Sequence, residues 1–310
     1  MTLVELAANG VVYSSIIVLG SIGLSLIYSI AGFANFAHGD TMTIGAYAAF
    51  VAFGLVGGIG AGLSLFGLPL GFFLAIFIGA LATAAVALLT ERLVYRPIDT
   101  GPIGLLITSI GVAFIYRGAV QIGFGADFRR YDVGTLRPIE SLLPYGIRIT
   151  RHDLAIVLSA AVFVAALHAL LQYTDLGRKM RATADNPKLA RVAGIRTRRI
   201  ELVTWMIGAG LAGAAGVFLG LFNQLVPRMG FNVLLVIFAA VILGGIGSVY
   251  GAMLGGFLIG MVVEMTPLLS TIGIPIGVEY ATAVAFVIMI AVLLLRPTGI
   301  AGEAVAGEGG

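Results

Sequence analysis

Nine long apolar runs, separated by short polar segments, constrain the fold of this chain more than any other feature. They fall at about 12–31, 41–57, 67–90, 102–124, 153–173, 201–222, 233–249, 251–267 and 279–295. A helix of roughly 20 apolar residues crosses the hydrocarbon core of a bilayer and keeps its own backbone polar groups paired there. Charged residues make up 11% of the chain, against about a quarter in soluble proteins. The sequence therefore predicts an all-α, polytopic transmembrane helical bundle.

About eight or nine of these runs are expected to span the membrane, some of them as broken or half helices. The runs at 41–57 and 233–249 are short and rich in glycine, so either could be a half-helix. Small residues at helical spacing, such as Gly208 and Gly216, predict helices that pack closely. Residues 1–300 are expected to form one transmembrane domain, followed by a flexible C-terminal tail at 301–310.

A basic segment at 174–200 indicates how the spans are oriented. It carries eight of the eighteen basic residues, opposed only by Asp175 and Asp185. Loops rich in Lys and Arg stay in the cytoplasm, so counting spans outward places the N-terminus and 125–152 in the periplasm and the C-terminus inside. Eleven basic residues then lie inside and six outside. Topology thus explains the basic excess, and no nucleic-acid partner is expected; the partners at this surface include membrane lipid.

A cluster of polar residues interrupts the apolar sequence between the first two runs. It contains Asn35, His38 and Asp40. One interpretation is a tight turn in which Asp40 or Thr41 caps the next helix and Gly39 supplies backbone freedom. The other is an unwound segment that points the three side chains into a substrate path, because irregular backbone is tolerated where it lines a cavity. The sequence leaves both interpretations open.

A short helix is predicted inside the basic segment. Asn186 or Asp185 can cap it, Pro187 suits its first position, and Gly194 can end it. Apolar residues such as Leu189 alternate with basic ones, which makes the helix amphipathic. It could lie on lipid headgroups or in the groove of a cytoplasmic partner, and the residues alone do not decide.

Three further residues near or inside the spans call for an explanation. Arg117 and Glu264 are charged residues within predicted spans, and they could snorkel to water, pair with each other or form a gate. Trp205 lies at the inner end of its span and is expected to anchor the helix at the membrane interface.

Three motifs occur in a characteristic order along the chain. They are Asn35-Phe-Ala-His-Gly39, Arg181-Ala-Thr-Ala-Asp-Asn-Pro-Lys-Leu-Ala-Arg-Val-Ala-Gly-Ile195 and Gly244-Gly-Ile-Gly-Ser-Val-Tyr-Gly251. Together they resemble the membrane subunit of branched-chain amino acid ABC importers of the LivH type, over about residues 14–299. The resemblance implies a permease domain at 1–300 that works by alternating access. It also implies a periplasmic loop at 125–152 and a cytoplasmic coupling loop at 174–200.

The resemblance further implies a division of labour among several chains in a bacterial inner membrane. The implied partners are an M-type permease subunit, two cytoplasmic ATPase subunits and a periplasmic amino-acid-binding protein. The residues implied to couple to the ATPase are Thr183, Asp185, Asn186, Pro187, Lys188, Leu189, Arg191 and Gly194. This chain contains no Gly-Lys-Ser/Thr phosphate-binding motif. We therefore expect no enzymatic activity and no directly bound cofactor, with ATP used by the partners.

The expected substrate is a branched-chain or similar small apolar amino acid, with urea or short amides as the alternative. A stand-alone secondary transporter or channel is a less favoured hypothesis. It would need a relay of intramembrane carboxylates, and beyond Asp40 and Glu264 the spans offer almost none. A membrane enzyme is disfavoured because the chain has no cysteine and no histidine cluster.

Overall fold

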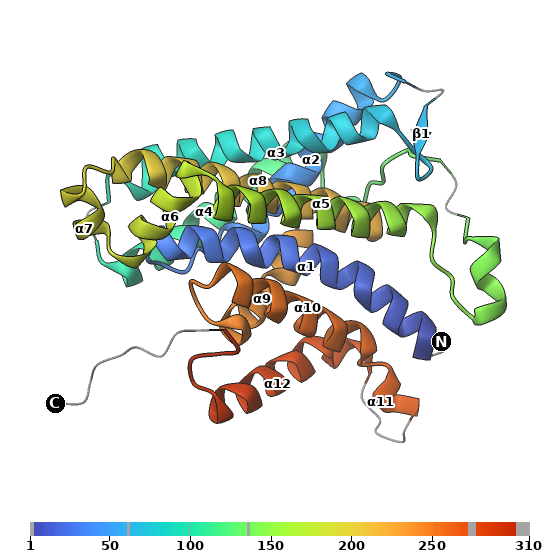
Figure 1. The fold of residues 1–310 in the computed structure, drawn as a ribbon. Coiled ribbons are helices and arrows are strands. Elements are labelled where there is room, and N and C mark those ends of the chain that lie inside the picture. Colours follow the sequence, from blue (N-terminus) through green and yellow to red (C-terminus); the bar gives the residue numbers. More distant parts are fainter. Residues whose placement is uncertain (1–2, 61–62, 99, 135–136, 272–276, 302–310) are drawn as a thin grey trace.

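The computed structural model describes residues 3–60, 63–98, 100–134, 137–271 and 277–301, which are predominantly helical (Figure 1). All nine apolar runs form helices, which confirms the predicted all-α bundle. These helices are α1 (Leu3–Ala31), α2 (His38–Val56), α3 (Leu70–Thr90), α4 (Pro102–Phe124), α5 (Arg151–Tyr173), α8 (Thr197–Phe222), α9 (Met229–Gly244), α10 (Val249–Met265) and α12 (Ala281–Leu295).

Short elements connect the long helices. They are the antiparallel hairpin β1 (Ser64–Leu65) and β2 (Leu68–Pro69), the π-helix η1 (Glu91–Tyr95), the 3-10 helices η2 (Glu140–Tyr145) and η3 (Val278–Tyr280), and the helices α6 (Asp175–Asp185), α7 (Pro187–Val192) and α11 (Leu268–Thr271). Residues 302–310 of the predicted tail lie outside the described residues.

Six helices in the described part of the chain are long and apolar enough to cross a bilayer: α1, α2, α3 continued by η1, α4, α5 and α8. The run at 41–57 forms α2, whose 19 residues make it longer than the short run in the sequence suggested. The run at 233–249 forms α9, whose 16 residues reach about 24 Å at 1.5 Å per residue. This is shorter than the hydrocarbon core of roughly 30 Å.

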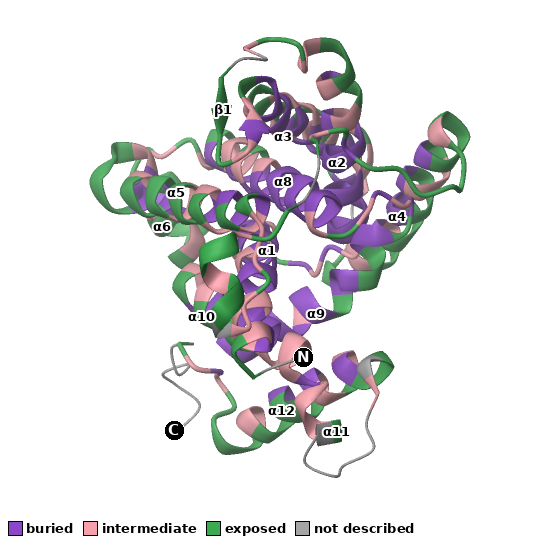
Figure 2. Cartoon of the chain, turned by 90° about the vertical axis from the view of Figure 1, so that its right-hand side faces the viewer, coloured by how far each residue is buried: buried purple, intermediate pink, exposed green. Residues whose placement is uncertain are grey.

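Two groups of four helices pack in the same pattern. The helices α1, α2, α3 and α4 of the first group correspond to α8, α9, α10 and α12 of the second. Helix α1 packs on α10, and correspondingly α8 packs on α3. Within the groups, α2 contacts α3 and α4 just as α9 contacts α10 and α12. Equivalent helices run in opposite directions, since α1 starts at the end of the bundle with the β1–β2 hairpin and α8 starts at the end with α7 (Figure 1). This is an inverted repeat, a common architecture of transporters. The two groups are intertwined, since α1 contacts both α10 and α8 while α8 also contacts α2 and α3, and buried residues concentrate along α1, α2 and α8 (Figure 2).

Glycines make the central helix crossings possible. A Cβ atom added at Gly216 would overlap the backbone carbonyl of Met42, and one added at Gly208 would lie 2.8 Å from the carbonyl oxygen of Gly23. The predicted close packing is thus confirmed in α8. Gly39 and Gly230 likewise bring α2 and α9 into backbone contact.

Replacing Gly216 with alanine is expected to lower the melting temperature of the detergent-solubilised protein, because the added methyl group must displace the α2 backbone. Overpacking of this kind costs about 1–3 kcal/mol. The matched control is Gly111→Ala on α4, where an added Cβ meets no atom within 4 Å. Equal melting temperatures for the two variants would contradict the close crossing.

Candidate functional site

The segment 32–37 turns back into the bundle after α1 ends. Gly32 reverses the chain with a φ of +72°, and α2 begins at His38. The Nε2 atom of His38 donates to the carbonyl oxygen of Gly20 at 2.9 Å. Gly20 lies eleven residues before the last residue of α1, so α2 starts about 16 Å inside the bundle. We call residues 32–37 the re-entrant segment.

A turn precedes α2, because the N–H of His38 donates to the carbonyl oxygen of Asn35 at 3.2 Å, but the capping and the role of Gly39 expected in the tight-turn interpretation are wrong. The N-cap of α2 is Ala37 and no side chain caps the helix, so neither Asp40 nor Thr41 has that role. Gly39 does not have a positive φ; its lack of a side chain lets the backbone of Gly230 approach. Residues 32–37 are not helical and lie beside α1 inside the bundle, while the substrate path of the second interpretation stays a prediction.

Asn35 holds the re-entrant segment in place. Its Oδ1 atom accepts hydrogen bonds from the backbone N–H of Ala37 at 3.0 Å and from the hydroxyl of Tyr95 at 3.2 Å. The next residue, Phe36, donates its N–H to the hydroxyl of Ser109 on α4 at 2.9 Å. The segment is therefore tied to η1 on one side and to α4 on the other.

Asp40 forms a two-pronged ion pair with Arg117 of α4. The two hydrogen bonds, from Nε to Oδ1 and from Nη2 to Oδ2, are 3.1 and 2.9 Å long. The Asp40 side chain is fully buried and that of Arg117 is 11% exposed. The guanidinium also lies 4.3 Å from the ring centroid of Phe231 on α9. Two interpretations of Arg117, snorkelling and a pair with Glu264, are therefore wrong.

The three predicted substrate-path residues do come together, because Asn35, His38 and Asp40 all lie at the mid-depth start of α2. All three are buried, at 3%, 0% and 1% exposure. In this conformation their side chains hold the re-entrant segment and the α2–α4 contact. Their role in the substrate path stays a prediction.

The predicted short helix in the basic segment is confirmed as α7. The Oδ1 atom of Asn186 accepts from the N–H groups of Lys188 and Leu189 at 3.1 and 3.0 Å, and Pro187 occupies the first turn. Gly194 ends the helix with a φ of +83°. Asp185 is the last residue of α6 and does not cap α7.

Sequence reasoning missed α6, although its signals are present. Thr174 caps it by accepting from the N–H of Gly177 at 3.1 Å, and the buried Gly177, Met180 and Thr183 recur at helical spacing. Because Thr183 is 2% exposed, its side chain cannot contact a partner in this conformation. Asp185, Asn186, Pro187, Lys188, Leu189, Arg191 and Gly194 are exposed.

Two apolar side chains on α7 are more exposed than stability alone would favour. Leu189 is 65% exposed and Val192 is 86% exposed, while the intervening Ala190 is buried. Lys188 and Arg191 flank them. An exposed apolar pair within a basic surface fits both predicted interpretations, a helix on lipid headgroups and a helix in the groove of a partner.

Comparison with known proteins identifies the family. The family model described as the branched-chain amino acid transport system permease component matches residues 6–293. The chain belongs to this permease family. The high-affinity branched-chain amino acid permease protein BraD of Pseudomonas aeruginosa is 34% identical over 302 residues, covering 95% of this chain and 94% of the relative. LivH of Escherichia coli (strain K12) is 34% identical over 305 residues, covering 95% and 94%.

Less similar proteins also match over nearly the whole chain. The probable branched-chain amino acid permease LivH of Methanocaldococcus jannaschii is 30% identical over 301 residues, covering 95% of this chain and 91% of the relative. Among solved structures, PsaBC from Streptococcus pneumoniae in complex with Fab covers 95% of this chain and 91% of its own with a TM-score of 0.43 and 13% identity. A likeness at that level carries no argument. The named relatives are transport permeases, which confirms the resemblance drawn from the three motifs.

Open cavities lie at the end of the permease opposite α7. One, of about 450 Å³, lies where α8 ends and α9 begins and is lined by Arg130, Leu219, Phe222, Asn223, Gln224, Val226, Met229, Asn232 and Val233. The nearby chain is anchored by Tyr131, whose hydroxyl donates to the carbonyl oxygen of Ala46 at 2.9 Å. Burial raises the pKa of Tyr131 well above its usual value, so the phenol stays a neutral donor.

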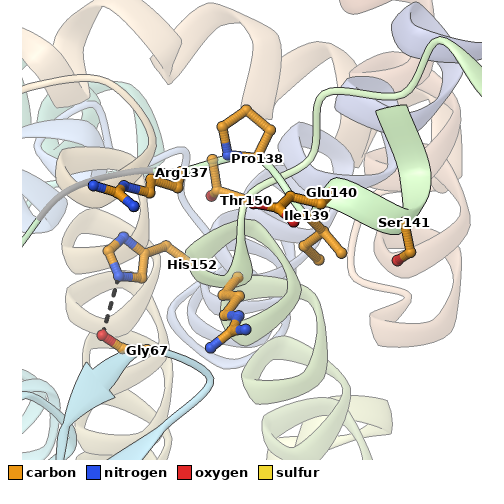
Figure 3. Close-up of a pocket in the computed structure, with 9 residues that line it drawn as sticks. Gly67, Arg137, Pro138, Ile139, Glu140, Ser141, Thr150 and His152 are labelled. Carbon is orange, nitrogen blue, oxygen red and sulfur yellow. Dashed lines mark hydrogen bonds between the residues drawn. The ribbon is translucent and has the colours of Figure 1, made fainter. Parts of the chain in front are cut away.

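The second cavity, of about 670 Å³, lies between the β1–β2 hairpin and the start of α5 (Figure 3). Its lining includes Arg137, Arg151, Glu140 and the buried His152. The Nε2 atom of His152 lies 3.3 Å from the carbonyl oxygen of Gly67 in the hairpin turn. Basic groups thus outnumber acidic ones at this mouth.

Trp205 of the permease is buried, and the prediction of an interface anchor is wrong. It is 3% exposed, and its ring stacks on Tyr95 with centroids 5.5 Å apart and an interplanar angle of 25°. Phe33 of the re-entrant segment completes the cluster. Helix α8 begins at Thr197, so Trp205 lies more than two turns inside it, and the sequence could not show which residues cover it.

Proposed function

We propose that this chain is the transmembrane permease subunit of an ATP-driven importer for branched-chain or similar small apolar amino acids. The observation that carries the proposal is the exposed, capped helix α7 at one end of a bundle that belongs throughout its length to the branched-chain amino acid permease family. In this proposal the helix docks on a partner that supplies the energy, which a transporter that works alone would not need.

The α7 end of the bundle is the cytoplasmic end in this proposal. Leu189 and Val192 dock into a groove of one of two ATPase subunits, and the neighbouring basic residues add electrostatic attraction. The N-terminal end and the 125–152 loop are then periplasmic, in a bacterial inner membrane. ATP is bound and hydrolysed by the partner, and the permease itself holds no cofactor.

The opposite end receives the amino acid. The cavity beside Arg137 and Arg151 suits an acidic surface of a periplasmic binding protein, because both guanidinium groups are exposed. The cavity at the α8–α9 junction combines Arg130 and side-chain amides with apolar groups such as Phe222. These are the groups that a zwitterion with an apolar side chain requires.

Transport follows an alternating-access mechanism between this chain and an M-type permease subunit. Closure of the ATPase subunits displaces α7 and repacks helices at the glycine crossings, where backbones touch without interlocking side chains. The start of α2 lies at mid-depth beside α9, the position at which transporters with broken helices hold their substrates. Asn35, His38 and Asp40 belong to the substrate path in this scheme.

Reconstitution in proteoliposomes tests the proposed function. We expect labelled leucine to enter the vesicles only with ATP and only when the binding protein, the M-type subunit and the ATPase are present with this chain. An excess of urea or acetamide is the specificity control and should not compete. Uptake by this chain alone, driven by an ion gradient and indifferent to ATP, would refute the proposal in favour of a secondary transporter.

A further inference from the structure

Helix α3 continues directly into the π-helix η1. The first and last residues of η1, Glu91 and Tyr95, make contacts with other helices. The N–H of Arg96 donates to the carbonyl oxygen of Glu91 at 2.8 Å, which closes the wide π turn. Both Glu91 and Tyr95 are buried. Single π turns inside long helices are frequent at functional sites, so the contacts of these two residues bear on what the turn does.

Glu91 connects the π turn to the start of α8. Its carboxylate accepts two hydrogen bonds from Arg198, from Nη1 at 2.6 Å and from Nη2 at 2.8 Å. The Glu91 side chain is 3% exposed and that of Arg198 is 36% exposed. Arg198 lies in the first turn of α8, six residues after Val192 at the end of α7. A displacement of α7 therefore reaches this ion pair through one short loop.

Tyr95 connects the same turn to the re-entrant segment. Its hydroxyl donates to Oδ1 of Asn35, the atom that also accepts from the N–H of Ala37 immediately before α2. Its ring is held between Trp205 of α8 and Phe33 of the re-entrant segment. The position of the first residues of α2 therefore depends on the position of the Tyr95 side chain.

We propose that Glu91 and Tyr95 are positioning residues that transmit a displacement of α7 to the mid-depth start of α2. The route runs from α7 to Arg198, across to Glu91, along one π turn to Tyr95, and through its hydroxyl to Asn35. The two steps that pass between elements, Arg198 to Glu91 and Tyr95 to Asn35, are buried or partly buried contacts between named atoms; the other two run along the chain. The inference rests on the proposed function for the source of the displacement, but not on the identity of the substrate.

Two features make this route stiff enough to carry motion. A bidentate carboxylate–guanidinium pair fixes orientation as well as distance, and this pair resists separation because the buried carboxylate of Glu91 would be left uncompensated. The second acid on Arg198, Glu201, lies one turn away on α8 itself at 3.0 Å. Its loss leaves the contact between helices intact, so it provides a matched control.

The absence of cysteine from the chain permits a direct measurement. A single cysteine at Ala34 in the re-entrant segment would report the local conformation through its rate of maleimide labelling. In the full complex with ATPase, M-type and binding-protein subunits, we expect this rate to change when ATP is trapped with vanadate. Glu91→Gln and Tyr95→Phe should each abolish that change, whereas Glu201→Gln should retain it.

Uptake measured on the same complexes gives a second readout. Substitutions along a coupling route alter coupling by about 0.5–2 kcal/mol, so leucine taken up per ATP hydrolysed should fall by a factor of about 2 to 30 in Glu91→Gln and Tyr95→Phe. A merely structural role would lower the amount of complex and both rates together, and the ratio would stay constant. Exchanging the charges with Glu91→Arg and Arg198→Glu should restore part of the ratio.

An ATP-dependent labelling change that persists in both Glu91→Gln and Tyr95→Phe would overturn the inference. If Glu91→Gln fails to assemble, Tyr95→Phe decides, because it removes a single hydroxyl and keeps the ring packing. A wild-type complex that imports no amino acid but still shows a labelling change abolished by these variants would refute the proposed substrate and support the route. The two proposals can therefore fail separately.

Discussion

Replacing Asp40 with alanine is expected to destabilise the permease by about 3–5 kcal/mol, because it leaves the guanidinium of Arg117 buried without its partner. It should also abolish ATP-driven uptake, since the pair fixes the start of α2 against α4. The measurement is the melting temperature in detergent together with leucine uptake by the reconstituted complex. The matched control is Asp175→Ala, which removes an ion pair with Arg178 whose side chains are 75% and 62% exposed and should change little.

The double variant Asp40→Ala with Arg117→Leu separates stability from transport. Replacing both members of a buried pair with apolar groups is often close to neutral for folding, so the melting temperature should return toward that of the wild type. Uptake should stay low if the pair takes part in the transport cycle. A melting temperature for Asp40→Ala equal to the wild type would contradict the buried pair itself, and full uptake by Arg117→Leu would refute a role in gating.

Changing Leu189 and Val192 together to aspartate is expected to lower ATP-dependent uptake by at least tenfold, a loss of about 1.4 kcal/mol or more at the ATPase contact. Both side chains are exposed, so the change should leave the fold and the melting temperature intact. Aspartate at these positions places a charge in an apolar contact, and it also reduces the net positive charge of the α7 surface that attracts the partner. Co-purification of the ATPase with the tagged permease measures the effect directly.

The control for this pair lies at the other end of the bundle. Leu63 and Leu65 are 68% and 54% exposed, and changing both to aspartate adds the same charge to exposed apolar positions. ATPase co-purification should be unaffected there. Retention of the ATPase by the Leu189→Asp, Val192→Asp variant would show that α7 is not the docking helix.

The features predicted well from the sequence are those that depend on neighbours within one turn of helix. The apolar runs predicted the helices because burial of backbone groups in lipid leaves no other choice. The cap of α7 was predictable because Asn186 bonds to N–H groups two and three residues away. Helix α6 has a comparable local signal in Thr174 and could have been found in the same way.

The wrong predictions concern partners that are distant in sequence. Arg117 pairs with Asp40, 77 residues away, and Trp205 stacks on Tyr95 of a different helix. The prediction that Gly39 supplies backbone freedom is wrong for the same reason. Gly39 is needed because the backbone of Gly230 packs against it, and the sequence around residue 39 does not reveal that contact. The partner of each of these residues depends on which helices pack together. Small residues allow many different helix pairs to pack closely, so the local sequence does not identify the partner helix.

The sequence by itself determined that this protein is a helical membrane bundle with a capped basic helix between two spans, because hydrophobicity and capping act over a few residues. The tertiary structure alone decided that the re-entrant segment returns to mid-depth, that Asp40 and Arg117 neutralise each other, and that η1 joins α8 to the start of α2. These features arise where helices that are distant in sequence pack against one another. The ion pair and the hydrogen bonds form there because a charge or donor removed from water must find its partner in whichever helix packs beside it.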